Sequence, residues 1–236
     1  SGSGELGDLR VLDNGITPYA WLTRKALRHA GAFVTINKEM EKELVQRGYP
    51  ADRIINIPDG IDLDRFHPLT NHAARSRTKR ELGFDERPIV SFVGVLRPEK
   101  NAGIFLEALD LLAKRDVPFQ GLMVGGGPLE QELRRQAEIL RLGDCVHFTG
   151  EQQDVAKFFQ ISDIFVLPSR SEGLPNALMQ AMACGAGCIA TDLSGTRELL
   201  GGDGGILLGS ADAQEIAQVV ERLILDPAYR KTLGEQ

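Results

Sequence analysis

Residues 164–191 read IFVLPSRSEGLPNALMQAMACGAGCIAT, and this stretch decides the fold class of the chain. The apolar run at residues 164–167 predicts a buried strand, residues 175–184 predict a helix, and residues 188–191 predict a second strand. A strand, a helix and a second strand in this order form a right-handed βαβ unit with parallel strands. The intervening turn delivers Glu172 to the carboxyl end of the first strand, where open α/β sheets bind ligands.

The turn after this strand also has the features of an anion site. Pro175 is predicted at the first position of the helix, where its missing N–H removes no helix hydrogen bond. The free amides around Gly173 and Leu174, with the helix dipole behind them, are placed to hold an anion. A carboxylate beside an anion cradle indicates a ligand that is both sugar-like and phosphorylated.

The alternation of short apolar runs and helices extends through the rest of the chain from Pro88 onward. Further strands are predicted at residues 89–93, 121–124, 146–148 and 205–208, and further helices at residues 102–114, 129–140, 155–161 and 213–225, the last of these being the final helix. This pattern predicts an α/β domain with a doubly wound parallel sheet.

The first part of the chain predicts a partial second α/β unit. Strands are expected at residues 33–36 and 54–57, and helices at residues 21–29, 38–46 and 73–82. Asn37 is a suitable N-cap for the helix at 38–46, and Gly48 is a suitable stop.

Composition excludes several classes of protein. With 236 residues, 42% apolar and 25% charged, the chain resembles an ordinary soluble protein. Its net charge of −6 argues against nucleic acid as the main partner. A local basic cluster is interpreted as a solvated helix face; it comprises Arg75, Arg77, Lys79 and Arg80. No apolar run is long enough to span a membrane, and no signal peptide opens the sequence.

The cysteines indicate a reducing compartment. Cys145, Cys184 and Cys188 are odd in number and show no metal-ligand spacing with the histidines. We therefore expect reduced, structural thiols and a cytoplasmic location, with peripheral membrane association of the full-length protein as an alternative.

The stretch around Glu172 resembles the donor-binding signature of the retaining glycosyltransferases of family 4, whose GT-B fold has two facing Rossmann-like domains. The usual family pattern is Glu-Gly-x-Pro followed by a second Glu eight residues after the first. Glu172, Gly173 and Pro175 match it, whereas Gln180 stands in place of the second Glu. The resemblance implies that Glu172 is the catalytic carboxylate, which stabilises an oxocarbenium-like transition state. It also implies that Gln180 holds the donor ribose less tightly than a Glu would.

The resemblance assigns phosphate contacts to the loop after the strand at 89–93. In the family an Arg directly after a Gly, and a Lys five residues further on, grip the donor phosphates. Gly94 and Lys100 match, while Val95 stands at the Arg position. Arg97 is the side chain available to replace the missing Arg.

Three further segments are implied to lie at the donor pocket. Gly126 and Gly127 belong to a Gly-rich turn between a strand and a helix. The alternative interpretation is a tight turn that only packs the helix on the sheet. Pro128 argues against a dinucleotide-binding fingerprint. Gly150 and Glu151 resemble the nucleobase-binding edge of the family. Glu198 follows a turn similar to the family Gly-Gly-x-x-Glu motif, or is simply a helix N-terminal acid.

The resemblance implies a division at the segment Ile57-Pro58-Asp59-Gly60-Ile61-Asp62, which is similar to the interdomain linker of the family. Residues 1–68 are then the tail of the N-terminal, acceptor-binding domain with the linker, and residues 69–236 are the C-terminal, nucleotide-sugar-binding domain. The family helix that crosses back to the first domain is not expected within the sequence. We expect little or no transfer by this chain alone, because most of the acceptor side is missing.

The leading hypothesis is a glycosyltransferase that moves a sugar from a nucleotide-sugar to a carbohydrate or lipid-linked acceptor with retention of configuration. No metal or other cofactor is expected, because side chains and helix dipoles neutralise the diphosphate in the family, and no paired carboxylates suited to Mg²⁺ occur here. Two alternatives remain: a degenerate, non-catalytic module that binds a nucleotide weakly or stabilises a partner, and a nucleotide-sugar epimerase. The base, the sugar and the acceptor stay open.

Overall fold

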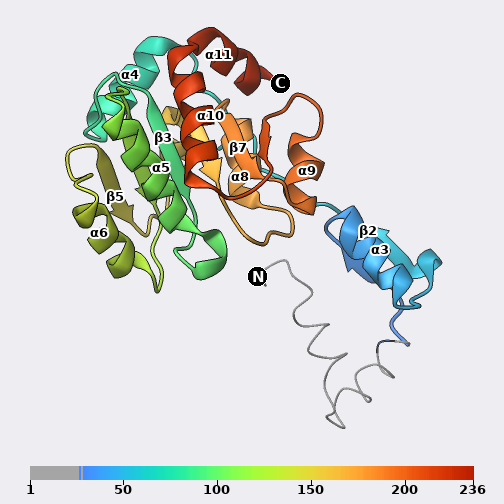
Figure 1. Cartoon of the computed structure of the whole chain (residues 1–236). Coiled ribbons are helices and arrows are strands. Elements are labelled where there is room, and N and C mark those ends of the chain that lie inside the picture. The colour runs from blue at the N-terminus through green and yellow to red at the C-terminus, as the bar shows by residue number, and fades with distance from the viewer. Residues whose placement is uncertain (1–26, 28) are drawn as a thin grey trace.

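The computed structural model describes residue 27 and residues 29–236 (Figure 1). Its larger body is built on a six-stranded sheet in which every pairing is parallel. The strands lie in the order β5 (Val146–Gly150), β4 (Gln120–Val124), β3 (Ile89–Val93), β6 (Ile164–Leu167), β7 (Gly187–Thr191) and β8 (Ile206–Leu208). The chain therefore winds outward from β3 in one direction and from β6 in the other, which confirms the predicted doubly wound sheet.

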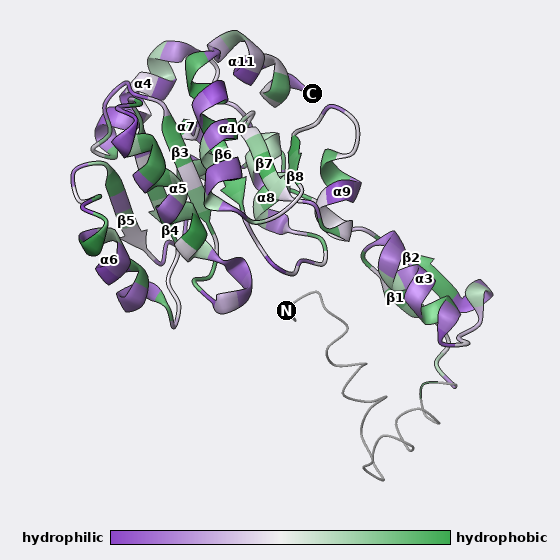
Figure 2. Ribbon diagram, viewed as in Figure 1, coloured by the Kyte–Doolittle hydropathy of each residue, from purple (hydrophilic) through white to green (hydrophobic). Residues whose placement is uncertain are grey.

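Helices cover both faces of this sheet because successive strand side chains point to opposite sides. Along β6, Ile164 and Val166 enter one hydrophobic core, while Phe165 and Leu167 enter the other. The first core is closed by α5 (Ala102–Lys114), α6 (Glu130–Ile139), α10 (Ala213–Leu225) and α11 (Pro227–Glu235). The second is closed by α7 (Ala156–Ile161), α8 (Asn176–Ala183) and α9 (Ser194–Leu200). Figure 2 shows hydrophobic strands between helices whose outer surfaces are hydrophilic.

A smaller unit precedes the large one. Strands β1 (Phe33–Thr35) and β2 (Ile54–Asn56) pair in parallel, and α3 (Lys38–Gln46) with the short 3₁₀ turn η1 (Ala51–Arg53) connects them. The side chain of Asn37 caps α3 by accepting from the Met40 amide at 2.8 Å, as the sequence predicts. The division of the chain at residue 68 stays a prediction. The helix predicted at 21–29 lies almost wholly outside the described residues.

The basic cluster on α4 (His72–Glu81) is not simply a solvated face. Lys79 is 3% exposed and lies 3.3 Å from Asp163 Oδ2, and Arg75 lies 2.9 Å from Asp163 Oδ1. Arg77 remains exposed and pairs with Glu81 on its own helix. The prediction was wrong for Lys79 and Arg75. Asp163, just before β6, has a side chain that is only 8% exposed, and a buried carboxylate needs cations beside it.

Other differences from the predictions concern the start of α8, the segment after β7 and the residues that follow α10. Pro175 is the N-cap of α8 rather than its first residue, and α8 begins at Asn176. Residues 194–200 form the helix α9, which includes both Glu198 and the three residues before it that resemble the family turn. Residues 227–235 form α11, so that α10 is not the final helix: Asp226 caps α11 by accepting from the Tyr229 amide at 2.9 Å. Across the described part of the chain, none of these helices has the length and apolar character needed to cross a bilayer.

Candidate functional site

The candidate site lies at the carboxyl ends of β3 and β6, where the winding of the sheet reverses. Ligands of open α/β sheets bind at such a switch point because the loops after the two strands diverge and leave a crevice. The loop after β3 ends in the 3₁₀ turn η2 (Pro98–Lys100), and the loop after β6 carries Glu172. A backbone hydrogen bond of 2.8 Å from the Arg170 amide to the Glu99 carbonyl joins the two loops.

Lys100 and Glu172 meet across this crevice. Lys100 Nζ lies 2.7 Å from Oε1 and 2.9 Å from Oε2 of Glu172. The Glu172 side chain is 7% exposed and that of Lys100 is 26% exposed, so the lysine is the more accessible partner. The structure thus brings together the predicted catalytic carboxylate and the predicted phosphate-binding cation.

Ser169 was not singled out from the sequence, although it holds Glu172 in place. Its side chain is fully buried, and its hydroxyl donates to Glu172 Oε1 at 2.6 Å. The signal available in the sequence was a hydroxyl residue three positions before the glutamate, at the end of a buried strand. Ser169 and Lys100 together fix the orientation of both carboxylate oxygens.

The amides predicted to hold an anion are present at the start of α8. In the described part of the chain, the N–H groups of Gly173 and Leu174 have no hydrogen-bond acceptor. The turn that carries them packs against α9, because a Cβ on Gly195 would lie 1.5 Å from the Gly173 carbonyl oxygen. Only glycine at position 195 permits this approach. The contact with α9 supports the turn that carries Glu172.

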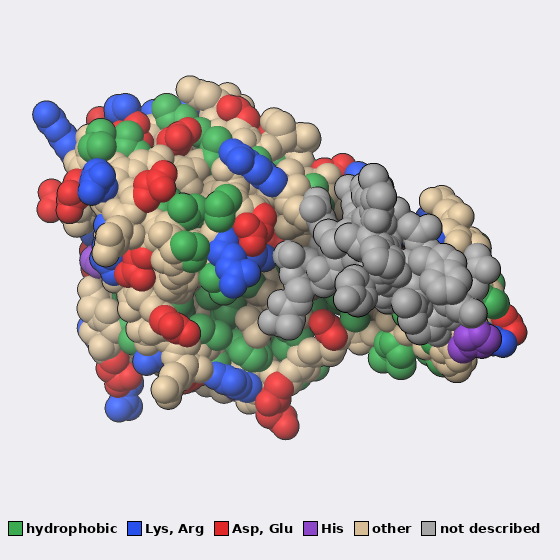
Figure 3. Space-filling model, turned by 90° about the horizontal axis from the view of Figure 1, so that it is seen from below, with side chains coloured by type: hydrophobic (Ala, Val, Ile, Leu, Met, Phe, Trp, Pro, Cys, Tyr) green, Lys and Arg blue, Asp and Glu red, His purple; other side chains and the backbone are tan. Residues whose placement is uncertain are grey.

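A cavity of about 450 Å³ adjoins this crevice on the β4 and β5 side. Its lining includes six predicted site residues: Gly94, Arg97, Gly126, Gly127, Glu151 and Gln180. Valine, proline and alanine side chains supply apolar walls: Val93, Val95, Val124, Pro128, Val155 and Ala177. On the face of the protein seen in Figure 3, acidic, basic and hydrophobic side chains lie interspersed.

The glycines of the loop after β4 are required by close backbone packing. Gly125 has φ +134°, and a Cβ there would lie 2.0 Å from the Gly94 carbonyl oxygen. Gly127 has φ +153°, and a Cβ there would lie 2.6 Å from the Leu96 carbonyl oxygen. The predicted tight turn therefore exists, but it packs against the loop after β3 and forms the floor of the cavity.

Gln152 in the cavity lining donates to the Thr149 carbonyl at 2.9 Å, whereas Arg97 is open to a ligand. Arg97 is exposed, and its guanidinium has no partner among the described residues. Val95 and Gln180 both line the cavity, so the two departures from the family pattern affect one site. Gly150, at φ +67°, closes the edge beside Glu151 and accepts from the Gly125 amide at 2.9 Å.

Glu198 lies away from the cavity. It is exposed on α9, and its Oε2 accepts from the Lys38 amide at 3.3 Å, at the first residue of α3. A carboxylate at a helix N-terminus interacts favourably with the helix dipole. The contact links the small N-terminal unit to the large one.

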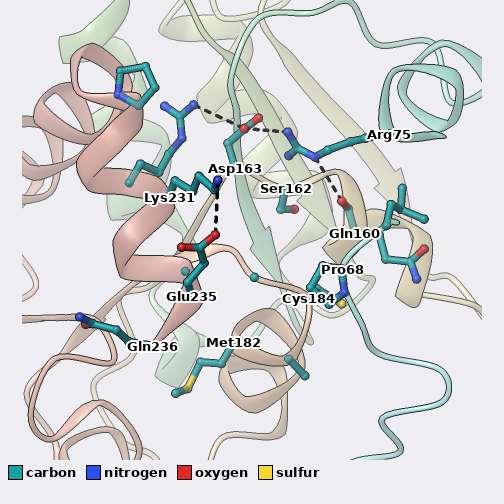
Figure 4. A pocket seen from close by; sticks show the side chains of 16 residues that line it. Pro68, Arg75, Gln160, Ser162, Asp163, Met182, Cys184, Lys231, Glu235 and Gln236 are labelled. Carbon is teal, nitrogen blue, oxygen red and sulfur yellow. Dashed lines mark hydrogen bonds and ion pairs between the residues drawn. The ribbon is translucent and has the colours of Figure 1, made fainter. Parts of the chain in front are cut away.

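A larger cavity of about 740 Å³ lies at the opposite, amino-terminal end of β6 (Figure 4). Its charged groups are already paired with one another: Lys231 with Glu235 at 3.5 Å, and Arg75 and Arg230 with Asp163 at 2.9 and 3.7 Å. The Cys184 thiol on its wall has its pKa raised to about 12 by burial, so it is not a nucleophile at neutral pH. The smaller cavity, with unpaired polar groups and free amides beside it, is the better candidate.

Comparison with known protein families shows which family the chain belongs to. The profile of the family Glycosyl transferases group 1 matches residues 74–236. The chain belongs to this family. The matched residues contain every strand of the large sheet together with Lys100, Glu172 and the 450 Å³ cavity.

Known glycosyltransferases are similar in sequence and in fold. The alpha-D-kanosaminyltransferase of Streptomyces kanamyceticus is 29% identical over 91% of this chain and 56% of its own length. A GDP-mannose-dependent mannosyltransferase of Mycolicibacterium smegmatis, which acts on a phosphatidylinositol monomannoside, is 29% identical over 90% of this chain and 59% of its own. Anabaena HepE, solved with UDP and glucose, has a TM-score of 0.77 and 23% identity over 87% of this chain and 56% of that one. This likeness confirms the Rossmann-like GT-B fold, and the chain spans little more than half the length of these proteins.

Proposed function

We propose that this chain is the donor-binding part of a retaining, family 4 glycosyltransferase, which transfers a sugar from a nucleotide-sugar to a carbohydrate or lipid-linked acceptor. The observation that carries the proposal is the meeting of Lys100 and Glu172 at the switch point, beside an open cavity. A diphosphate needs a cation and free amides, and a sugar needs a carboxylate to receive its hydroxyl hydrogen bonds.

The order of the loops along the sheet edge arranges the donor. The loops after β5, β4, β3 and β6 follow one another, and with strands spaced about 4.8 Å apart they extend over roughly 14 Å. The sugar would lie against Glu172, the diphosphate between Lys100, Arg97 and the amides of Gly173 and Leu174, and the nucleoside over Gly126 and Gly127.

Each residue has one role in the proposed transfer. Glu172, fixed by Ser169, would stabilise positive charge that develops on the sugar ring as the bond to the diphosphate breaks. Lys100 would leave Glu172 and neutralise the departing phosphate. No cofactor enters this scheme, because side chains and helix amides supply the positive charge.

The acceptor would be presented by a preceding domain, of which residues 1–68 are the proposed tail. We infer that this chain alone transfers sugar slowly or not at all, and that the full-length protein works in the cytoplasm, at the membrane surface if its acceptor is a lipid.

Val95 and Gln180 support a second candidate, a degenerate module that binds nucleotides weakly. Both positions face the cavity, and together they remove one cation and one carboxylate from the family pattern. A melting-temperature panel of uridine, guanosine and adenosine diphosphates tests both proposals. Stabilisation by a diphosphate at millimolar concentration supports donor binding, and no shift with any of them contradicts it.

The doubly restored variant Val95→Arg, Gln180→Glu separates the two candidates. A gain in donor affinity of a hundredfold or more indicates a decayed site, because each restored charge-assisted contact contributes about 1.5–3 kcal/mol. A gain of less than about threefold indicates that the cavity already holds its donor well without these contacts.

A further inference from the structure

We infer that Glu151 makes the cavity select a guanine base, so that the donor is a guanosine diphosphate sugar. This inference rests on the proposed function, because it assumes that the cavity receives a nucleotide. The relatives use different bases by name, one depending on GDP-mannose and HepE being solved with UDP. Side chains that line the cavity differ between such proteins, and we take them as the groups that choose between bases bound at the same edge.

The cavity lining carries two charged side chains of opposite sign. Arg97 lies in the loop after β3, three residues before Lys100, and Glu151 lies in the loop after β5, two strands away. The diphosphate belongs at the basic end. The base is then directed to the end that holds Glu151.

Glu151 is the acidic group of this edge that stays available to a ligand. Glu130 is held by Arg134 at 2.9 Å, and Asp154 is held by Arg65 at 3.1 Å. Glu151 is exposed, lines the cavity, and forms no ion pair within the described residues. A Cβ added to Gly126 would lie 3.3 Å from the Glu151 Cβ, so this side chain begins beside the glycine turn that lines the cavity.

A carboxylate distinguishes the nucleobases by their hydrogen-bond donors. Guanine presents N1–H and the 2-amino group side by side, and both can donate to the two oxygens of one carboxylate. Uracil presents one N–H between two carbonyls, and adenine and cytosine present one amino group beside a ring lone pair. A bidentate pair of this kind discriminates by about 1–3 kcal/mol, so the guanine nucleotide should bind tighter by roughly fivefold to a hundredfold.

Calorimetric titration of the chain with GDP, UDP, ADP and CDP tests the inference. We expect GDP to bind at least fivefold tighter than the other three. In Glu151→Gln, GDP should lose most of this advantage while UDP affinity stays within about twofold. Glu132→Gln, which removes an equally exposed charge from α6 outside the cavity, should leave the preference intact.

The outcomes separate this inference from the proposed function. Binding of UDP, ADP or CDP as tightly as GDP overturns the guanine selectivity and leaves donor binding standing. A preference for GDP that survives in Glu151→Gln overturns the role of Glu151. If none of the four nucleotides binds, the proposed function itself is contradicted, and the inference falls with it.

Discussion

Lys100 Nζ lies within 2.9 Å of both carboxylate oxygens of Glu172, although 72 positions separate the two residues in the chain. Each is proposed to touch a different part of the donor: Lys100 the phosphate and Glu172 the sugar. While they are paired, the lysine charge is shared with the carboxylate. Binding of a diphosphate must therefore compete with an internal ion pair.

Glu172→Gln should raise the affinity for a free nucleoside diphosphate several-fold, because Lys100 loses its competing carboxylate. Lys100→Met should lower that affinity about tenfold or more, since a hydrogen bond to a charged group contributes about 1.5–3 kcal/mol. Calorimetry with GDP measures both variants. Lys114→Met, on the exposed surface of α5, serves as the control for loss of one positive charge. Weaker GDP binding by Glu172→Gln would contradict the competition.

Ser169→Ala should separate sugar recognition from diphosphate binding. The buried hydroxyl orients Glu172 Oε1, so its loss should weaken binding of a nucleotide-sugar while affinity for the nucleoside diphosphate stays within about twofold. We also expect about 1–2 kcal/mol lower free energy of unfolding, measured by urea denaturation. Equal loss of affinity for both ligands would show that Ser169 supports the whole site rather than Glu172.

Gly195→Ala should disturb the turn that carries Glu172. The new Cβ would meet the Gly173 carbonyl oxygen at 1.5 Å, which forces the turn and α9 apart. We expect a loss of about 1–3 kcal/mol of stability and a marked loss of nucleotide-sugar affinity. Gly209→Ala, where nothing lies within 4 Å of the added Cβ, should be nearly neutral in both measurements. Equal stability and affinity of the two variants would mean that the turn is free to move.

The buried charge cluster at Asp163 predicts a pH-dependent stability. Burial alone would raise the pKa of the Asp163 carboxyl, but Arg75, Lys79 and the Ile89 amide outweigh burial and hold that pKa below its ordinary value. A carboxyl with a depressed folded pKa stabilises the fold above its unfolded pKa of about 3.9, and this contribution disappears as the pH falls through the folded value.

Asp163→Asn should therefore lower the free energy of unfolding by about 3–5 kcal/mol at pH 7, because it leaves Arg75 and Lys79 without their counter-charge. Below pH 3.9 the difference between the variant and the natural sequence should shrink as the carboxyl protonates. Urea denaturation across this range measures it. A difference that stays constant down to the acid unfolding transition would contradict the role given to the charge of Asp163.

Local patterns were enough to predict most of the fold. The predicted bounds of α3, α5 and α10 coincide with the structure because apolar periodicity and flanking turn residues agree there. The helix α11 was not predicted, because the helix at residues 213–225 was taken as the final one; the local signal was Asp226-Pro227, an N-cap followed by a first-turn proline.

The contacts that complete the site depend on distant parts of the chain, which local patterns do not contain. Nothing around Lys79 signals burial, which arises only when α4 meets Asp163 before β6. Nothing around Gly195 signals that it lies against Gly173. The family pattern supplied the residues of the cavity but not Ser169, which acts through Glu172.

The most direct test of the account is to locate nucleotide binding on the protein by amide chemical-shift changes during titration with GDP and UDP. We predict that the largest shifts fall on the amides of residues 94–97, 99–100, 125–127, 150–152 and 173–174, at the carboxyl edge of the sheet. Shifts confined to α11 and the segment around Asp163, at the opposite edge, or an absence of shifts at millimolar nucleotide, would contradict the assignment of the donor site.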